Sequence, residues 1–176
     1  QTSTGHMAFD VAFGPYASDK VNVTGNAVVA GTGTVTLTWL ENAKPVTLFS
    51  TTGVGVNNGL KIDSTLAMTY KVLDGASGIQ LGYSSNFGQG FLNRNLRALG
   101  GHMDSALTEG DSGGIGRLMA LLGNLRTGEE KTYSGIFNEL NPEPFIAPLI
   151  TQTVAAAGFS NDLFSCAPGH EVRGNI

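Results

Sequence analysis

Ser112 is the residue whose surroundings could most directly support catalysis. It lies in the run Gly110-Asp111-Ser112-Gly113-Gly114. Glycines on both sides of a serine let the backbone turn tightly and point N–H groups at an oxyanion, as acyl transfer to a hydroxyl requires. A serine nucleophile also needs a base within hydrogen-bond reach and a group that orients this base. The rest of the chain must supply both.

This run resembles the segment around the nucleophile of chymotrypsin-like serine proteases. The candidate bases, His6 and His102, do not lie in the small-residue, cysteine-flanked motif that carries the base in that family. Ile115 stands where the family has a proline, and helical patterns rather than barrel strands flank the serine. We interpret the segment as a polar connector between two helices, with Asp111 or Ser112 as N-cap. A serine hydrolase stays an alternative, and loss of fluorophosphonate labelling in Ser112→Ala would favour it.

The other ionisable residues lack the spacing of a metal or acid–base site. His6, His102 and His170 are isolated, since no second histidine or cysteine follows any of them at i+2, i+3 or i+4, as a zinc pair would need. Glu129 and Glu130 are neighbours, which point in different directions on a helix, so we expect an acidic first turn. No nucleotide-binding glycine loop follows a strand pattern. We predict no catalytic, cofactor-binding or metal-binding residue.

The chain has one cysteine, Cys166, so it cannot form an internal disulfide. Four roles stay open for this residue: a buried thiol, a pair with a cysteine outside this chain, an intermolecular bridge, or a nucleophile.

The composition favours a β-rich fold with many turns. Of the 176 residues, 14% are charged and 25 are glycines, and the net charge is −4. Neither half has the basic patch that nucleic-acid binding requires. No apolar run is long enough to cross a membrane as a helix. Because a strand pattern begins close to Gln1, we expect a fragment of a longer protein.

The elements that would position these residues change in character near Phe91. Before it, apolar and polar residues alternate with the period of half-buried strands, and turn residues separate the alternating runs. This pattern leaves a sandwich, a barrel or a β-solenoid. The residues expected on the buried faces are Phe9, Val11 and Phe13; Val21 and Val23; Val35, Leu37 and Trp39; Leu66, Met68 and Tyr70; and Ile79, Leu81 and Tyr83.

Residues 8–13 and 33–39 resemble each other: each is a long alternating run that follows a Gly or Thr turn. They are separated by about 26 residues, a length typical of one solenoid coil.

After Phe91 the apolar residues follow a helical repeat. We predict three helices and a fourth one after the N-cap Asn141 and Pro142. A flexible tail is expected after Cys166. The residues expected on the apolar faces are Leu92, Leu96, Leu99, Met103 and Leu107; Ile115, Leu118, Met119, Leu122 and Leu125; Tyr133, Ile136, Phe137 and Leu140; and Phe145, Leu149, Ala156, Phe159 and Leu163.

Several segments, in this order, resemble the C-terminal part of bacterial autotransporter passengers. Residues 5–11, 18–25 and 33–37 are similar to their last coils, with an SD turn, a VxVxG strand and a GTV strand. Residues 92–99 are similar to the Leu/Asn/Arg helix that follows the β-helix, although a proline common there is missing. Residues 140–143 and 161–166 are similar to the final helices before the translocator.

This resemblance implies an α+β chain: the end of a short β-solenoid, a right-handed parallel β-helix, or another β-rich half, followed by three to four short helices. The expected regions are passenger coils at 1–91, a helical junction or cap at 92–166 and a flexible tail at 167–176. Autotransporters belong to type V secretion and reach the outer membrane or cell surface of Gram-negative bacteria. The implied partner is the C-terminal outer-membrane β-barrel of the same polypeptide, outside this fragment.

The predicted function is a non-catalytic stem that caps a solenoid and promotes its folding, because each coil of a solenoid templates its neighbour. A homodimer through the helical region is left open. The alternative is an adhesin-like ligand-binding β-domain with Tyr16, Trp39, Tyr70 and Tyr83 as candidate contacts, although we expect most of these in the core. Specific glycan binding that is lost on mutation of Trp39 would favour it.

Overall fold

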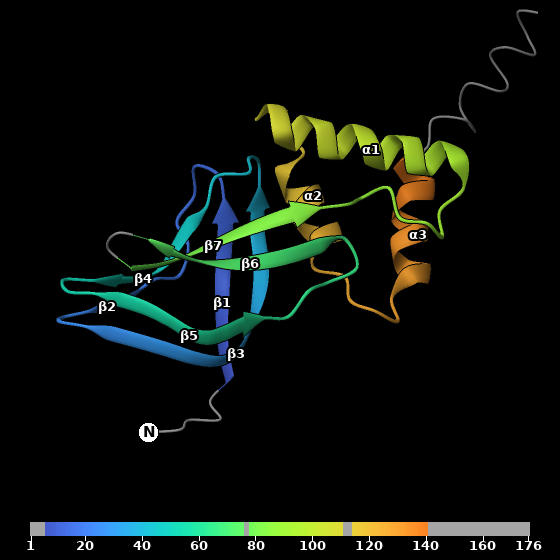
Figure 1. Cartoon of the computed structure of the whole chain (residues 1–176). Coiled ribbons are helices and arrows are strands. Elements are labelled where there is room, and N and C mark those ends of the chain that lie inside the picture. Colours follow the sequence, from blue (N-terminus) through green and yellow to red (C-terminus); the bar gives the residue numbers. More distant parts are fainter. Residues whose placement is uncertain (1–5, 76–77, 111–113, 141–176) are drawn as a thin grey trace, which may run out of the picture. The chain divides into compact units, whose positions relative to one another are not determined.

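A computed structural model of the chain describes residues 6–75, 78–110 and 114–140 (Figure 1). Within these ranges two sheets precede three helices, in agreement with the predicted α+β class. In chain order the elements are β1 (His6–Phe13), β2 (Val21–Val23), β3 (Ala27–Leu40), β4 (Val46–Thr51), β5 (Gly55–Ile62), β6 (Met68–Gly75), β7 (Gly78–Ser85), α1 (Arg94–Glu109), α2 (Gly116–Gly123) and α3 (Glu130–Leu140).

The described elements up to Phe137 belong to one compact unit. The second unit starts at Asn138, and only its first residues, at the end of α3, are described. The predicted fourth helix and the predicted tail lie outside the described residues.

The first sheet is parallel and has the strand order β1-β3-β5. His6 lies opposite Thr32 on β3, and Ala27 at the start of β3 lies opposite Gly55 on β5. The two stretches that resemble each other in the sequence are therefore neighbours in this sheet. β3 is long enough to pair with β1 along its C-terminal part and with β5 along its N-terminal part.

The second sheet has the order β2-β4-β7-β6 and mixes two kinds of pairing. β2 is parallel to β4, with Val21 opposite Phe49. β7 is antiparallel to both β4 and β6. The parallel progression of this sheet thus ends at β4.

β3 changes its buried face near its C-terminal end. Val35 and Leu37 are buried, as the alternation predicts, but Thr38 is exposed and the next buried residue is Leu40. A β-bulge shifts the register with β1 at this point, and a one-residue shift moves the following side chains to the opposite face. The prediction that Trp39 shares the buried face is therefore wrong, and its side chain is half-buried.

The helical spacing predicted the core faces of α1 and α3. All five residues of the first predicted helical stripe are buried or packed against the core. One of them, Leu92, lies just before α1 rather than in it. α1 has Asn93 as N-cap, whose side chain accepts a hydrogen bond from the N–H of Leu96. On α3, Tyr133 and Phe137 are fully buried.

α2 begins later than the sequence predicts. Its N-cap is Ile115, which forms no side-chain capping bond, and the helix starts at Gly116. Asp111 and Ser112, the predicted N-cap residues, lie outside the described residues. Ile115 is 42% exposed rather than buried. The reason is that Gly116 packs against the ring of Trp39, and a pattern of apolar side chains overlooks a contact made by a glycine.

One hydrophobic core joins strands and helices. Every described element except β2 contributes buried residues to it. Such a core ties the orientation of the helices to the strands, because interiors are packed closely. Its largest fully buried side chains are Tyr133, Phe13, Phe87, Phe137, Leu40, Leu48, Met68, Ile79, Leu81, Leu107, Met119 and Leu122.

We expect Gly100→Ala to destabilise the fold and Gly101→Ala to stabilise it. A Cβ at Gly100 would lie 2.5 Å from the backbone of Phe87 and Gly88, whereas a Cβ at Gly101 meets nothing within 4 Å. Overpacking costs about 1–3 kcal/mol, and replacing a free helical glycine by alanine gains about 0.5–1 kcal/mol. Urea unfolding followed by circular dichroism measures both. Equal effects of the two substitutions would contradict the proposed packing of α1.

Candidate functional site

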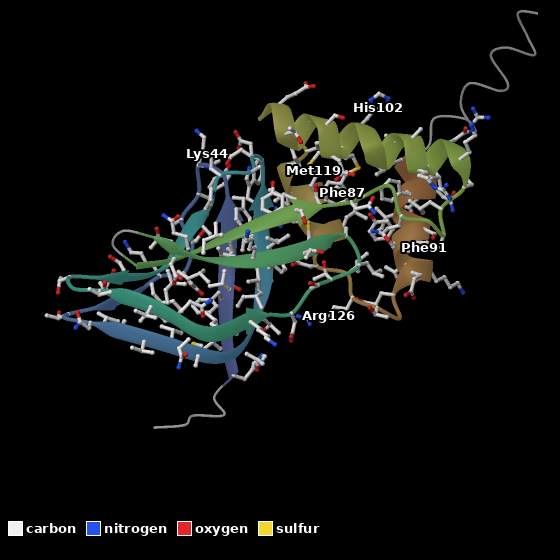
Figure 2. The ribbon with its side chains drawn as sticks, in the orientation of Figure 1. Lys44, Phe87, Phe91, His102, Met119 and Arg126 are labelled. Carbon is white, nitrogen blue, oxygen red and sulfur yellow. The ribbon has the colours of Figure 1, made fainter. Side chains whose placement is uncertain are left out.

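The residues with possible chemistry do not come together in the described part of the chain. Ser112, Cys166 and His170 lie outside the described residues. His6 is exposed on β1, with its ring nitrogens 3.4 and 3.2 Å from two threonine hydroxyls of β3. His102 projects from the outer side of α1, away from the other labelled residues (Figure 2).

The described residues offer no group of three or more His, Cys, Asp and Glu that could hold a metal ion. None of the described helices is both long and apolar enough to cross a membrane. Glu130 is the acidic residue in the first turn of α3, and its carboxylate accepts a hydrogen bond from the N–H of Gly128, just before the helix, at 3.1 Å. This bond lowers the pKa of Glu130, and it agrees with the predicted acidic first turn.

The feature that stands out instead is the way in which the sheets end. A strand at a sheet edge presents N–H and C=O groups that need partners. For each strand, we call the side that faces the later strands of the strand order its downstream edge. In the second sheet β7 occupies the edge of β4 and pairs with it in antiparallel orientation. No further parallel strand can therefore stack on β4.

Asn124 closes the downstream edge of β3. β5 pairs with β3 only as far as Gly33, so the following residues of β3 have no strand on that side. The side chain of Asn124, at the end of α2, accepts a hydrogen bond from the N–H of Leu37 at 2.7 Å and donates one to its C=O at 2.9 Å. The amide thus replaces both bonds of a neighbouring strand.

Further side-chain and backbone bonds hold this end of the molecule. The hydroxyl of Thr65 donates to the C=O of Gly123 at 2.7 Å, and the N–H of Leu66 donates to the C=O of Leu125 at 2.9 Å. The carboxylate of Asp74 on β6 accepts a hydrogen bond from the N–H of Asn57 on β5 at 2.9 Å. The loops before β6 and after α2 are therefore fixed to each other.

The backbone of Phe87, between β7 and α1, forms hydrogen bonds with side chains of two helices. Its N–H donates to the carboxylate of Asp104 on α1, and its C=O accepts from the hydroxyl of Tyr133 on α3, each at 2.9 Å. Phe87 itself is fully buried, and Figure 2 labels it on the segment that leads from β7 towards α1. Burial, followed by the nearby Asp104 carboxylate, raises the pKa of Tyr133. The hydroxyl therefore stays a proton donor at neutral pH.

The four aromatic candidates for ligand binding separate into two pairs. Tyr70 is buried and Tyr83 is half-buried, and burial raises the pKa of both phenols. These two residues agree with the expected core position. Tyr16, by contrast, is 58% exposed and contacts the half-buried Trp39 edge to face at 4.9 Å.

Trp39 also lines a surface hollow of about 570 Å³ beside α2. Its indole N–H donates to Glu41 at 2.9 Å, and a Cβ at Gly116 would lie only 2.6 Å from its ring. The ring thus packs directly against the backbone of α2. Arg117 and Leu121 of α2 line the same hollow. We interpret Trp39 as a packing contact between α2 and β3 rather than as a ligand contact.

Comparisons with protein-family models, with curated proteins and with solved structures found no match to this chain.

Sequence analysis did not single out Asn124, Asp104 or Tyr133 as residues that close this end of the molecule. The available signal was weak: Asn124 follows Gly123 at the end of a helical pattern, where a polar residue is common. Its partner Leu37 is 87 positions away, so no local pattern indicates the bond.

We expect Asn124→Ala to lower the free energy of unfolding by about 1–3 kcal/mol, because it leaves the buried N–H and C=O of Leu37 without partners. Asn58→Ala, at an exposed position on β5, serves as the control and should change stability by less than about 0.5 kcal/mol. Urea unfolding compares the two. A similarly small effect of both substitutions would contradict the closure of the β3 edge by Asn124.

Proposed function

We propose that this chain is the non-catalytic end of a parallel β-solenoid, a stem that caps the coils before it. The observation that carries this proposal is the repeated parallel pairing one coil apart. The offset is 26 residues for His6 and Thr32, 28 for Val21 and Phe49, and 28 for Ala27 and Gly55. Stacked coils of constant length generate such offsets.

The downstream end supports the capping part of the proposal. A solenoid coil that ends in solvent leaves an open sheet edge and an open apolar interior. In this chain the antiparallel β6–β7 pair lies against β4, and the Asn124 amide occupies the edge of β3. The buried faces of α1 and α2 add to the same core as the strands. These features would stop the addition of coils and exclude water from the last one.

We further propose that the stem belongs to an autotransporter passenger, exposed at the surface of a Gram-negative bacterium through type V secretion. The support is the resemblance of residues 18–25, 33–37 and 92–99 to passenger coils and the helix after them. The partner is the outer-membrane β-barrel of the same polypeptide, outside this chain. Self-association through the helical region stays a prediction, for which the 54% exposure of Leu121 is the support.

The alternatives have less support. A ligand-binding β-domain retains two of its four aromatic candidates, Tyr16 and Trp39, and the hollow beside them is the observation that favours it. A serine hydrolase at Ser112 gains no support, since neither His6 nor His102 lies beside a described acid–base partner that would orient it.

The capping role predicts that the strands need the three described helices. We expect a chain that ends at residue 91 to associate or precipitate, because the core face and the edge of β3 become exposed. The control chain ends at residue 140 and keeps all three helices. Light scattering after gel filtration gives the oligomeric state of each. If the 1–91 chain has the oligomeric state and unfolding midpoint of the control, the capping role is wrong.

The autotransporter assignment predicts display on cells. We fuse the chain, behind a secretion signal, to an outer-membrane β-barrel translocator in a Gram-negative host. Antibody labelling of intact cells should detect the chain, and Gly116→Leu, which would displace α2 from Trp39, should reduce the labelling severalfold. Gly135→Leu, at a position with nothing within 4 Å, is the control. Retention of the unaltered chain in the periplasm would argue against the assignment.

A further inference from the structure

At the other end of the two strand orders, the outer edges of β1 and β2 lack a strand partner among the described residues. β1 and β2 come first in the strand orders, and no described strand pairs with their outer sides. Val21 on β2 is 43% exposed, although its partner on β4, Phe49, is buried. An open parallel edge next to exposed apolar residues invites another strand.

Half of the β1 edge is already occupied by the turn that follows this strand. The N–H of Asp10 donates to the carboxylate of Asp19 at 2.9 Å, and the C=O of Asp10 accepts the N–H of Asp19 at 2.8 Å. The N–H of Ala12 donates to the hydroxyl of Ser18 at 2.9 Å, and this hydroxyl lies 3.1 Å from the C=O of Ala12. We call these four bonds the edge clip.

The edge clip covers only the C-terminal half of the outer edge of β1. In a parallel strand, alternate residues direct their backbone groups to the same side. His6 and Ala8 therefore face the same side as Asp10 and Ala12. Among the described residues, however, nothing bonds the outward backbone groups of His6 and Ala8. The edge is thus open at its N-terminal half and closed at its C-terminal half.

The downstream edge of β3 has a matching arrangement. There the strand β5 pairs with the N-terminal part of β3, and Asn124 closes the part beyond Gly33. In both places a strand has room along one half, and polar side chains take the bonds of the other half. This repetition indicates which partner fits β1. It is a parallel strand that covers only the N-terminal half of β1, as β5 covers only the N-terminal part of β3.

We propose that Ser18 and Asp19 limit the docking edge of β1 to His6 and Ala8, and that this edge takes one parallel strand from a preceding coil of the same polypeptide. The inference rests on the proposed solenoid. The clip fixes the register of the incoming strand, because pairing must stop opposite Ala8. It also protects the remaining edge from a second copy of the chain.

Amide hydrogen exchange, measured by NMR on the whole chain, tests the clip. In Ser18→Ala/Asp19→Ala, exchange at Asp10 and Ala12 should accelerate at least about tenfold, while exchange at Leu37 stays unchanged. Asn124→Ala is the matched control and should accelerate Leu37 alone. Unchanged exchange at Asp10 and Ala12 in the double variant would contradict the proposed edge clip. This result is independent of the truncation experiment, which tests the proposed capping of the solenoid.

An added coil tests the docking edge. A copy of residues 27–51, which form β3 and β4, is placed before residue 1, and a scrambled copy is the control. Exchange at His6 and Ala8 should slow at least about tenfold with the true copy only, and exchange at Asp10 and Ala12 should not change. Two results would overturn the assignment. The first is no change in exchange at His6 and Ala8 when the true copy is added. The second is a slowing in the chain without the added copy that increases with protein concentration, because this would indicate pairing with a second copy of the chain.

Discussion

The constraint on which this structure depends is that the backbone N–H and C=O groups at each sheet edge need hydrogen-bond partners. The chain meets it in three ways. Parallel strands 26 to 28 positions apart in the sequence pair with each other, β7 pairs with β4 in the reverse direction, and side chains take the bonds where no strand reaches. Asn124 and the pair Ser18 and Asp19 perform this last task at opposite edges of the first sheet. Strand pairing is therefore blocked at Leu37 on one edge of this sheet and at Asp10 and Ala12 on the other.

Close packing of the helices follows from the same arrangement. The Asn124 amide reaches Leu37 only because α2 lies directly on β3, and the contact between Gly116 and Trp39 permits that approach. Phe87 is tied to α1 and α3 through Asp104 and Tyr133. These polar contacts orient the helices, while the apolar core stabilises them.

The residue patterns predicted the elements better than their ends. Alternation identified β1, the first part of β3, β6 and β7, and the helical stripe identified α1 and α3. The prediction of burial was wrong at Trp39, where a β-bulge shifts the register, and at Ile115, where Gly116 makes the contact. It was also wrong at Val21 on β2 and at Leu140 at the end of α3, which are 43% and 38% exposed. A bulge depends on the neighbouring strand, and a glycine contact depends on the partner ring, so neither is visible in the local pattern.

The sequence by itself determined the strand and helix periods, the order of β-rich and helical parts, and the repeat of about 26 residues, because these depend on neighbours along the chain. Only the tertiary structure decided which sheet edges are closed and by which residues. Leu37 and Asn124 are 87 positions apart, and their bond exists only after β3 and α2 have packed together. Edge closure is a property of packed elements, and a linear pattern of polarity does not contain it.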